Sequence, residues 1–268
     1  MTKKITIIVA AHKSYAMPQD KMYLPIFVGA KGKEDIELRK PFVRDDSGNN
    51  ISEKNPNFCE LTGVYWAWKN LKDAEYVGVA HYRRYLIRKG AAHGKNSKDV
   101  LKYILNSNEA DELLDNYDII LPVKRHYVVE TIKNHWLHTL PEEPFIETRK
   151  IIEKKCPEYL AEFDKLSRRR SMHAFNLFVM RRDIFDKYCD WLFDILFELE
   201  KRIDMTDYNP YQKRLLGMMS ERLLDVFLRT NKMTGRCVEI PVINLEGQNY
   251  IKKATNVLKA KFLGKKYE

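Results

Sequence analysis

Cysteine and long apolar runs are both scarce in this chain. Its four cysteines, Cys59, Cys156, Cys189 and Cys237, are widely separated among 268 residues and form no Cys-x-x-Cys pair. This spacing argues against a disulfide framework or a cysteine-rich zinc site and favours a reducing, cytoplasmic location. No apolar run approaches the ~20 residues of a membrane-spanning helix. The apolar segment 5–11 is also too short for the core of a secretory signal.

The charge of the chain is strongly positive. Lys and Arg number 47 against 37 Asp and Glu, which gives a net charge of +10 and a pI near 9.2. A surplus of this size predicts an anionic partner, such as nucleic acid, an acidic lipid surface or a phosphorylated substrate. Because acids are interspersed with the bases and no common nucleic-acid-binding motif is present, we expect no nucleic-acid partner.

The apolar patterns predict an α/β fold. Segments 5–11, 76–80 and 117–122 are β-branched or apolar runs typical of buried strands. Between the first two, apolar residues from 61 to 71 recur at helical spacing, with Asn57 as a candidate cap and the tryptophans of this segment in the core. Later helical stripes favour a helical C-terminal part. We predict one domain, residues 1–246, with a mixed central sheet.

A dense polar cluster, His81-Tyr82-Arg83-Arg84-Tyr85, follows the strand predicted at 76–80. Ligands of open α/β sheets bind beyond the carboxyl ends of the strands, and the planar guanidinium group of arginine suits phosphate. The cluster therefore indicates a site for a phosphorylated ligand. The alternative is a buried arginine paired to a carboxylate, with the tyrosines as core packing.

Two further polar residues interrupt apolar segments. Glu221 lies on a helix predicted from about 211 to 229 that is apolar nearly all round, and Gly217, one turn earlier, is expected to leave space beside it. Glu221 could act as a general base or pair with Arg222 or with an arginine of the cluster. Asn176 interrupts a strand predicted at 174–180, where it could bind a ligand hydroxyl or belong to a structural network.

Periodicity fails from residue 124 to 147, which predicts a loop or lid beside a site. His135 and His138 lie in this segment, and their i, i+3 spacing could place both on one helical face as metal ligands. A third ligand at defined spacing is missing. Residues 247–268 are predicted to form a basic amphipathic helix that suits an anionic membrane surface or, alternatively, packs back on the domain.

Taken together, several motifs make the chain resemble a bacterial family of polysaccharide glycosyltransferases first catalogued as a domain of unknown function. The motifs are His12-Lys13, Asp46-x-x-x-Asn50-Ile51-Ser52, Asn57-x-Cys59-Glu60-Leu61-Thr62-x-x-Tyr65-Trp66-x-Trp68-Lys69-Asn70, the cluster at 81–85, Asn176-Leu177-Phe178-Val179-Met180 and Gly217-Met218-Met219-Ser220-Glu221-Arg222-Leu223-Leu224. The resemblance implies a GT-A-like nucleotide-sugar fold. It also implies galactosyl or galactofuranosyl transfer from a UDP-sugar to a lipid-linked oligosaccharide in capsule, exopolysaccharide or lipopolysaccharide synthesis.

The chain departs from GT-A enzymes at one place. These enzymes usually hold a divalent metal on an Asp-x-Asp motif, whereas here the comparable place holds His81-Tyr82-Arg83-Arg84. We hypothesise that cationic side chains neutralise the leaving diphosphate, so that no metal cofactor is needed. If a metal is required, Asp45 or Asp46 becomes the expected ligand. Alternation along an extended segment would point Arg83 and Arg84 in opposite directions, so that one of them meets phosphate.

These arguments predict an inverting glycosyltransferase, peripherally associated with the inner face of the cell membrane, with Glu221 as the base. The residues expected to contact nucleotide or sugar are His12, Lys13, Asp46, Asn50, His81, Tyr82, Arg83, Arg84, His173 and Asn176. One rival hypothesis is a metal-dependent hydrolase that uses His81, His135 and His138. Another is a non-catalytic binding module attached to the membrane by its basic tail.

Overall fold

The side chains of β1 (Ile5–Ala11) alternate between two hydrophobic cores, one on each face of a central sheet. Ile8 and Ala10 belong to the larger core, whereas Ile7 and Val9 belong to the smaller one. Successive side chains of a strand point to opposite faces, so a strand that is apolar throughout must be covered on both sides. The computed structural model describes residues 2–33, 42–88 and 100–245.

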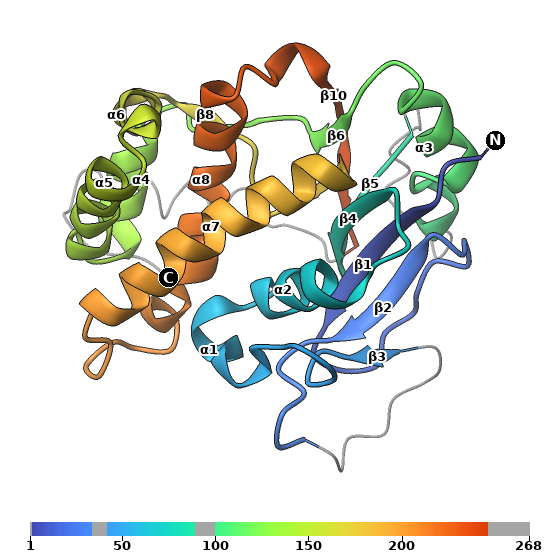
Figure 1. Cartoon of the computed structure of the whole chain (residues 1–268), viewed down its shortest axis with the longest axis horizontal. Helices are drawn as coiled ribbons and strands as arrows, with labels where there is room; N and C mark the ends of the chain where they lie inside the picture. Colours follow the sequence, from blue (N-terminus) through green and yellow to red (C-terminus); the bar gives the residue numbers. More distant parts are fainter. Residues whose placement is uncertain (1, 34–41, 89–99, 246–268) are drawn as a thin grey trace.

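Within these described residues, nine strands form one mixed sheet (Figure 1). Its path runs β10 (Cys237–Ile240), β6 (Ile119–Pro122), β9 (Phe178–Arg181), β4 (Tyr76–His81), β1, β2 (Tyr23–Phe27) and β3 (Val43–Arg44). Off this path, β5 (Arg84–Leu86) pairs with β4, and β11 (Val242–Asn244) pairs with β5. Strand β9 is antiparallel to both neighbours, while β4, β1, β2 and β3 run parallel. The predicted mixed α/β sheet is confirmed.

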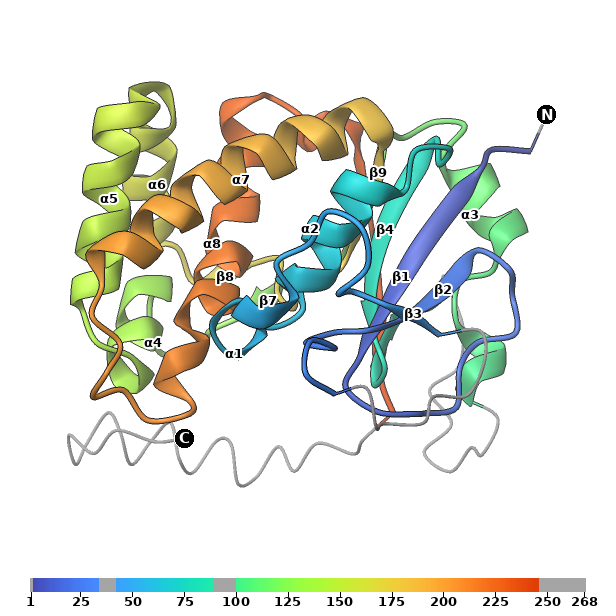
Figure 2. The same ribbon diagram turned by 60° about the horizontal axis from the view of Figure 1, so that its bottom comes forward.

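The helices are distributed unequally over the two faces of the sheet. The larger core is covered by α1 (Asn55–Phe58), α2 (Leu61–Asn70), α7 (Arg182–Arg202) and α8 (Leu215–Thr230), and the smaller by α3 (Ser107–Leu113). A helical part beside the sheet contains α4 (Ile132–Thr139), α5 (Glu143–Lys155) and α6 (Leu160–Arg168), with α5 packed on α7 and α6 on α8 (Figures 1 and 2). No helix among the described residues is long and apolar enough to cross a membrane.

The core positions predicted from helical spacing are confirmed. Trp66 is buried, and Trp68 stacks on Phe193 of α7 with ring centroids 5.8 Å apart. Offset stacking of this kind adds to the free energy of area burial, which explains why two tryptophans so close in sequence serve packing. The contact joins α2 to α7 and so ties the first half of the chain to the helical part.

Two local predictions were wrong. The segment 124–147 is not a loop, because it contains β7 (Arg125–His126), α4 and the start of α5. The Thr131 hydroxyl caps α4 by accepting a hydrogen bond from Asn134 N over 3.2 Å. The apolar residues of α4 span too few positions to show helical periodicity in the sequence. Asn57 is not a cap either, since it lies inside α1 and α2 begins at Leu61 without a side-chain cap. The tail predicted at 247–268 lies outside the described residues.

Candidate active site

The polar cluster at 81–85 forms a hairpin and not one extended segment. Strand β4 ends at His81, the chain turns at Tyr82 and Arg83, and β5 begins at Arg84, which pairs with His81. The extended segment on which the predicted alternation of the two arginines rested is therefore not formed. Because the side chains of a cross-strand pair share a face, His81 and Arg84 lie together. Both contact Phe175, whose carbonyl accepts from His81 Nε2 over 2.5 Å.

A pocket of about 590 Å³ lies at the carboxyl ends of β1 and β4. This volume is in the range of small-molecule sites, and the position is the one expected for ligands of parallel sheets. The pocket is lined by Ala10, Ala11, His12, Val28, Asn55, Pro56, Cys59, Glu60, His81, Tyr82, Arg83, Arg84, Phe175, Pro210, Lys213, Arg214 and Glu221. Basic side chains and two carboxylates thus meet in one cavity.

Arg84 is the lining residue best suited to an anion. Its guanidinium lies over the Phe175 ring, 4.5 Å from the centroid, and its Nε is buried with no hydrogen-bond partner among the described residues. Burial and the neighbouring charge of Arg83 lower the pKa of Arg84. A buried donor without an acceptor has a large free-energy cost, which an anionic ligand would remove.

Two stacked tyrosine rings lie beside the basic side chains of the pocket. Tyr15 stacks on Tyr82 with ring centroids 3.9 Å apart, and the Tyr15 hydroxyl hydrogen-bonds to His12 Nε2 over 3.0 Å. Lys13 Nζ lies 5.3 Å from the centroid of Tyr15, and the Arg83 guanidinium 5.4 Å from that of Tyr82. The hydrogen bond, the ring stacking and the two cation–π contacts together join His12, Lys13 and the hairpin turn.

Glu221 lines the pocket from α8. Burial raises the pKa of its carboxyl, while the charge of Arg222 and a hydrogen bond from the backbone of Phe175 oppose that rise. The predicted alternative of an ion pair with Arg222 is not formed. Arg222 Nη1 donates to the Met218 carbonyl over 2.7 Å, and the guanidinium lies 4.9 Å from the centroid of the Trp136 ring. A carboxylate of raised pKa that opens to a cavity is suited to accepting a proton.

Glu60 is a second carboxylate in the pocket, to which the sequence reading assigned no role. Its Oε1 accepts from Asn176 Nδ2 over 2.6 Å. Cys59, directly before it, has φ of 53°, a left-handed conformation that is costly outside glycine and is concentrated at functional sites. The one signal in the sequence was a carboxylate directly before an apolar helix, which equally fits a residue at a helix N-terminus.

Asn176 belongs to a structural network and does not line the pocket. Its Nδ2 also donates to the Gly217 carbonyl over 3.1 Å, and its Oδ1 accepts from Ser220 Oγ over 2.9 Å. It lies before β9 and not within a strand, with φ of 50°, so the predicted strand is present but begins at Phe178 and not at 174. A Cβ on Gly217 would lie 3.1 Å from Cys59 Cβ, which shows that the space expected there is filled by the chain.

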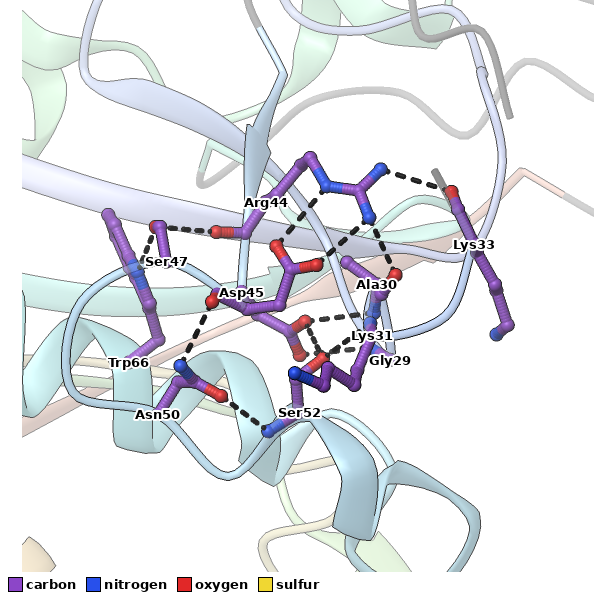
Figure 3. A network of polar contacts seen from close by, with 11 residues as sticks. Gly29, Ala30, Lys31, Lys33, Arg44, Asp45, Ser47, Asn50, Ser52 and Trp66 are labelled. Atoms are coloured by element: carbon purple, nitrogen blue, oxygen red, sulfur yellow. Dashed lines mark hydrogen bonds and ion pairs between the residues drawn. The ribbon is translucent and has the colours of Figure 1, made fainter. Parts of the chain in front are cut away.

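Polar contacts within the protein stabilise the conformation of the Asp46–Asn50 loop (Figure 3). Asp46 pairs with Arg44 over 2.9 Å, and Asn50 Nδ2 donates to the Asp46 and Gly48 carbonyls. Asp45 is fully buried and accepts from four donors: Gly29 N, Ala30 N, Ser52 Oγ and Thr62 Oγ1. Neither aspartate lines the pocket, and both use their carboxylates for contacts within the protein.

The remaining predicted histidines lie in separate polar groups. His173 is buried and hydrogen-bonds to Asp225 over 2.7 Å and to Glu239 over 3.1 Å, outside the pocket lining. His135 and His138 share a helical face as expected, but each Nδ1 hydrogen-bonds to Glu130 over 2.6 Å.

The hydrolase hypothesis requires His81, His135 and His138 to act together on a metal. Across the ranges that the structure describes, no three His, Cys, Asp or Glu residues are grouped so that they could hold a metal ion. His81 instead donates to the Phe175 carbonyl. The described residues thus do not supply the ligand set of that hypothesis.

Residues 6–232 match the protein family described as Domain of unknown function (DUF4422). The chain belongs to this family. Among solved structures, it is similar to the apo structure of the bifunctional glycosyltransferase WbbM, with a TM-score of 0.83 and 30% sequence identity. The match covers 91% of this chain and 46% of that one, so the chain spans less than half the length of WbbM. A search of curated proteins found no match.

The DUF4422 chain therefore combines the fold of a glycosyltransferase structure with a pocket of mixed charge. Of the residues predicted from sequence, the pocket brings together His12, His81, Tyr82, Arg83, Arg84 and Glu221. It does not include Lys13, Asp46, Asn50, His173 or Asn176 in its lining. Chemically, the basic side chains can neutralise an anionic leaving group while a carboxylate accepts a proton.

Proposed function

We propose that this chain is a glycosyltransferase that moves a sugar from a UDP-sugar to a hydroxyl of a lipid-linked oligosaccharide. Galactose or galactofuranose is the favoured sugar, in capsule, exopolysaccharide or lipopolysaccharide synthesis. The observation that carries the proposal is the pocket, in which Arg84 and Glu221 occupy one cavity at the carboxyl ends of parallel strands. The motifs shared with polysaccharide glycosyltransferases and the similarity to WbbM support it.

On the donor side, the diphosphate is proposed to lie against the β4–β5 hairpin. The buried Arg84 Nε has no acceptor within the described part of the chain, and Arg83, Lys213 and Arg214 add positive charge around the same cavity. Charge that develops on the departing UDP would then be neutralised by groups already in place. This arrangement would perform the electrostatic role of a divalent metal, and the proposal therefore requires no metal cofactor.

On the acceptor side, Glu221 is proposed to remove the proton from the attacking hydroxyl. The acceptor oxygen forms a bond to the anomeric carbon as the bond to UDP breaks, through an oxocarbenium-like state. One carboxylate that acts directly on the acceptor gives inversion at the anomeric carbon. Glu60, held by Asn176, is placed to accept hydrogen bonds from sugar hydroxyls in the same pocket.

A donor screen tests the proposal. The purified chain is incubated with UDP-, GDP- and TDP-sugars, and donor binding is measured by thermal shift and nucleotide release by a coupled assay. A rise in melting temperature and UDP release for a UDP-hexose, lost in Arg84→Gln, are the expected results. If no nucleotide sugar raises the melting temperature or is turned over, the proposal is wrong.

A further inference from the structure

A small β-ribbon outside the main sheet exposes apolar side chains. Strand β7 pairs antiparallel with β8 (Ser171–Met172) in a two-stranded sheet of its own (Figure 2). Val128 is 81% exposed, and Val123 and Val129 are 50% and 38% exposed. Of the six large hydrophobic side chains that are exposed among the described residues, three lie in this segment of seven. Such a concentration of exposed apolar side chains indicates an interaction surface.

Arginines flank these valines on the same ribbon. Arg125 precedes them, and the hydrogen bond from Tyr127 N to the Arg170 carbonyl, 2.7 Å long, places segment 168–170 beside the valine loop. Arg125, Arg168 and Arg170 are exposed, and none forms an ion pair with another described residue. Segments 123–129 and 165–172 contain no acidic residue. We call Arg125, Val128, Val129, Arg168 and Arg170 the ribbon patch.

We propose that the ribbon patch binds the anionic surface of a lipid bilayer. Exposed valines flanked by arginines without ion pairs are complementary to a layer of acidic head groups over hydrocarbon. The valines would be removed from water, and the arginines would be attracted to the acidic head groups. A second copy of the same patch would bring arginine against arginine. Single-stranded nucleic acid is typically bound by several bases stacked on exposed aromatic rings, whereas Tyr127 is buried and His126 is the one exposed ring of segment 123–129.

The patch lies close to the candidate active site. Strand β8 ends at Met172, and Phe175, three residues further along the chain, lines the pocket. Binding at the patch would hold the membrane near the pocket. This part of the inference, that the lipid-linked acceptor approaches along the ribbon, rests on the proposed function. Lipid binding by the patch does not.

Sedimentation of the full-length protein with lipid vesicles tests the inference. Vesicles of phosphatidylcholine alone are compared with vesicles that also contain phosphatidylglycerol. The test variants are Val128→Ser and the double change Arg168→Gln with Arg170→Gln. The matched controls are Ile146→Ser, which removes an exposed apolar side chain of α5, and Lys154→Gln with Lys201→Gln, which removes two exposed charges elsewhere.

The wild type should bind the vesicles that contain phosphatidylglycerol, and binding should weaken about fivefold for each arginine removed. Val128→Ser should also weaken it, while both controls bind as the wild type does. Equal loss of vesicle binding in test and control variants would overturn the inference. Unchanged vesicle binding in both test variants would also overturn it and would place lipid binding elsewhere on the chain. A wild type that ignores both vesicle types overturns it as well.

Donor turnover in buffer without vesicles separates the two proposals. The ribbon variants should release UDP at the wild-type rate, because neither Val128 nor the two arginines line the pocket. Vesicle binding without turnover by the wild type would leave the ribbon patch standing and contradict the glycosyltransferase proposal. Turnover without vesicle binding that depends on the ribbon patch would support the glycosyltransferase proposal and contradict the inference about the ribbon patch.

Discussion

Asn176 Nδ2 donates to Glu60 Oε1 over 2.6 Å, between residues that are 116 positions apart in sequence. The bond joins the junction of α1 and α2 to the turn before β9. Ser220 Oγ on α8 in turn fixes the Asn176 amide through a 2.9 Å hydrogen bond. Three separate parts of the chain thus set the position of one pocket carboxylate, which is how a precise site is supported.

Asn176→Asp should misplace Glu60, because the amide donor becomes a carboxylate that repels it. We expect the turnover number to fall about 10–100-fold, as for displacement of a positioned group by about 1 Å. The donor KM should change much less, and steady-state kinetics separate the two constants. Ser220→Ala is the graded comparison: it removes one support of Asn176 and leaves the bond to Glu60, so turnover should fall less than in Asn176→Asp. Loss of donor binding in place of turnover would contradict a positioning role.

Glu221→Gln should abolish transfer and spare donor binding. Loss of a general base typically lowers the rate by about 10²–10⁴-fold. Turnover is measured by UDP release to an acceptor and binding by thermal shift, with the exposed Glu158→Gln as the matched control. Near-normal turnover in Glu221→Gln would reject the assignment.

The pH dependence of the same reaction follows from the raised pKa of Glu221. A base must be deprotonated, so activity should rise with pH through a pKa above the ~4.3 of an exposed glutamate. Because the folded state favours the protonated carboxyl, the contribution of Glu221 to stability is present at low pH and lost as pH rises through the folded-state pKa. Glu221→Gln should therefore melt higher than the wild type at neutral pH. A melting temperature below that of the wild type would contradict this explanation.

Arg84→Gln should weaken binding of the donor through its diphosphate. A hydrogen bond from a charged donor is worth about 1.5–3 kcal/mol, which corresponds to about 10–100-fold in affinity. Calorimetry with UDP and with uridine separates the effects, since uridine lacks phosphate and should bind both proteins alike. Arg88→Gln, outside the pocket lining, serves as the control. Equal UDP affinity in Arg84→Gln and wild type would show that the anion lies elsewhere.

Chelation should leave transferase activity unchanged, because the proposed neutralisation of UDP relies on side chains. The measurement is UDP release before and after exhaustive treatment with a chelator, followed by addition of manganese. Activity that disappears with the chelator and returns with manganese would contradict the metal-free proposal.

His135 should make the protein sensitive to acid. Burial lowers its pKa to about 4, although the hydrogen bond to Glu130 acts in the opposite direction. Between the unfolded value of ~6.5 and about 4, the unfolded chain takes up a proton that the folded protein does not. Stability should therefore fall as pH drops through this window, and His135→Gln should flatten the fall in melting temperature. His126→Gln, on the exposed ribbon, should leave the curve unchanged.

The sheet and the edge that carries the candidate pocket could be predicted because they depend on local signals. Apolar runs such as 5–11 are long enough to identify a buried strand, and a polar cluster that follows such a run must lie at its carboxyl end. The segment 124–147 was mistaken for a loop because α4 and the start of α5 are short and interrupted. Helices of that length depend on tertiary packing more than on their own periodicity.

The sequence by itself determined the mixed α/β class, the core role of Trp66 and Trp68, and the place of the cluster at 81–85 beyond a central strand. Only the tertiary structure decided which polar residues meet in the pocket. Glu60 and Asn176 come together through a contact between distant segments. The left-handed backbone at Cys59, directly before Glu60, has no local sequence signal, whereas asparagine favours that conformation at position 176. A strained backbone conformation is kept only where contacts with the rest of the protein stabilise it, and those contacts come from long-range packing.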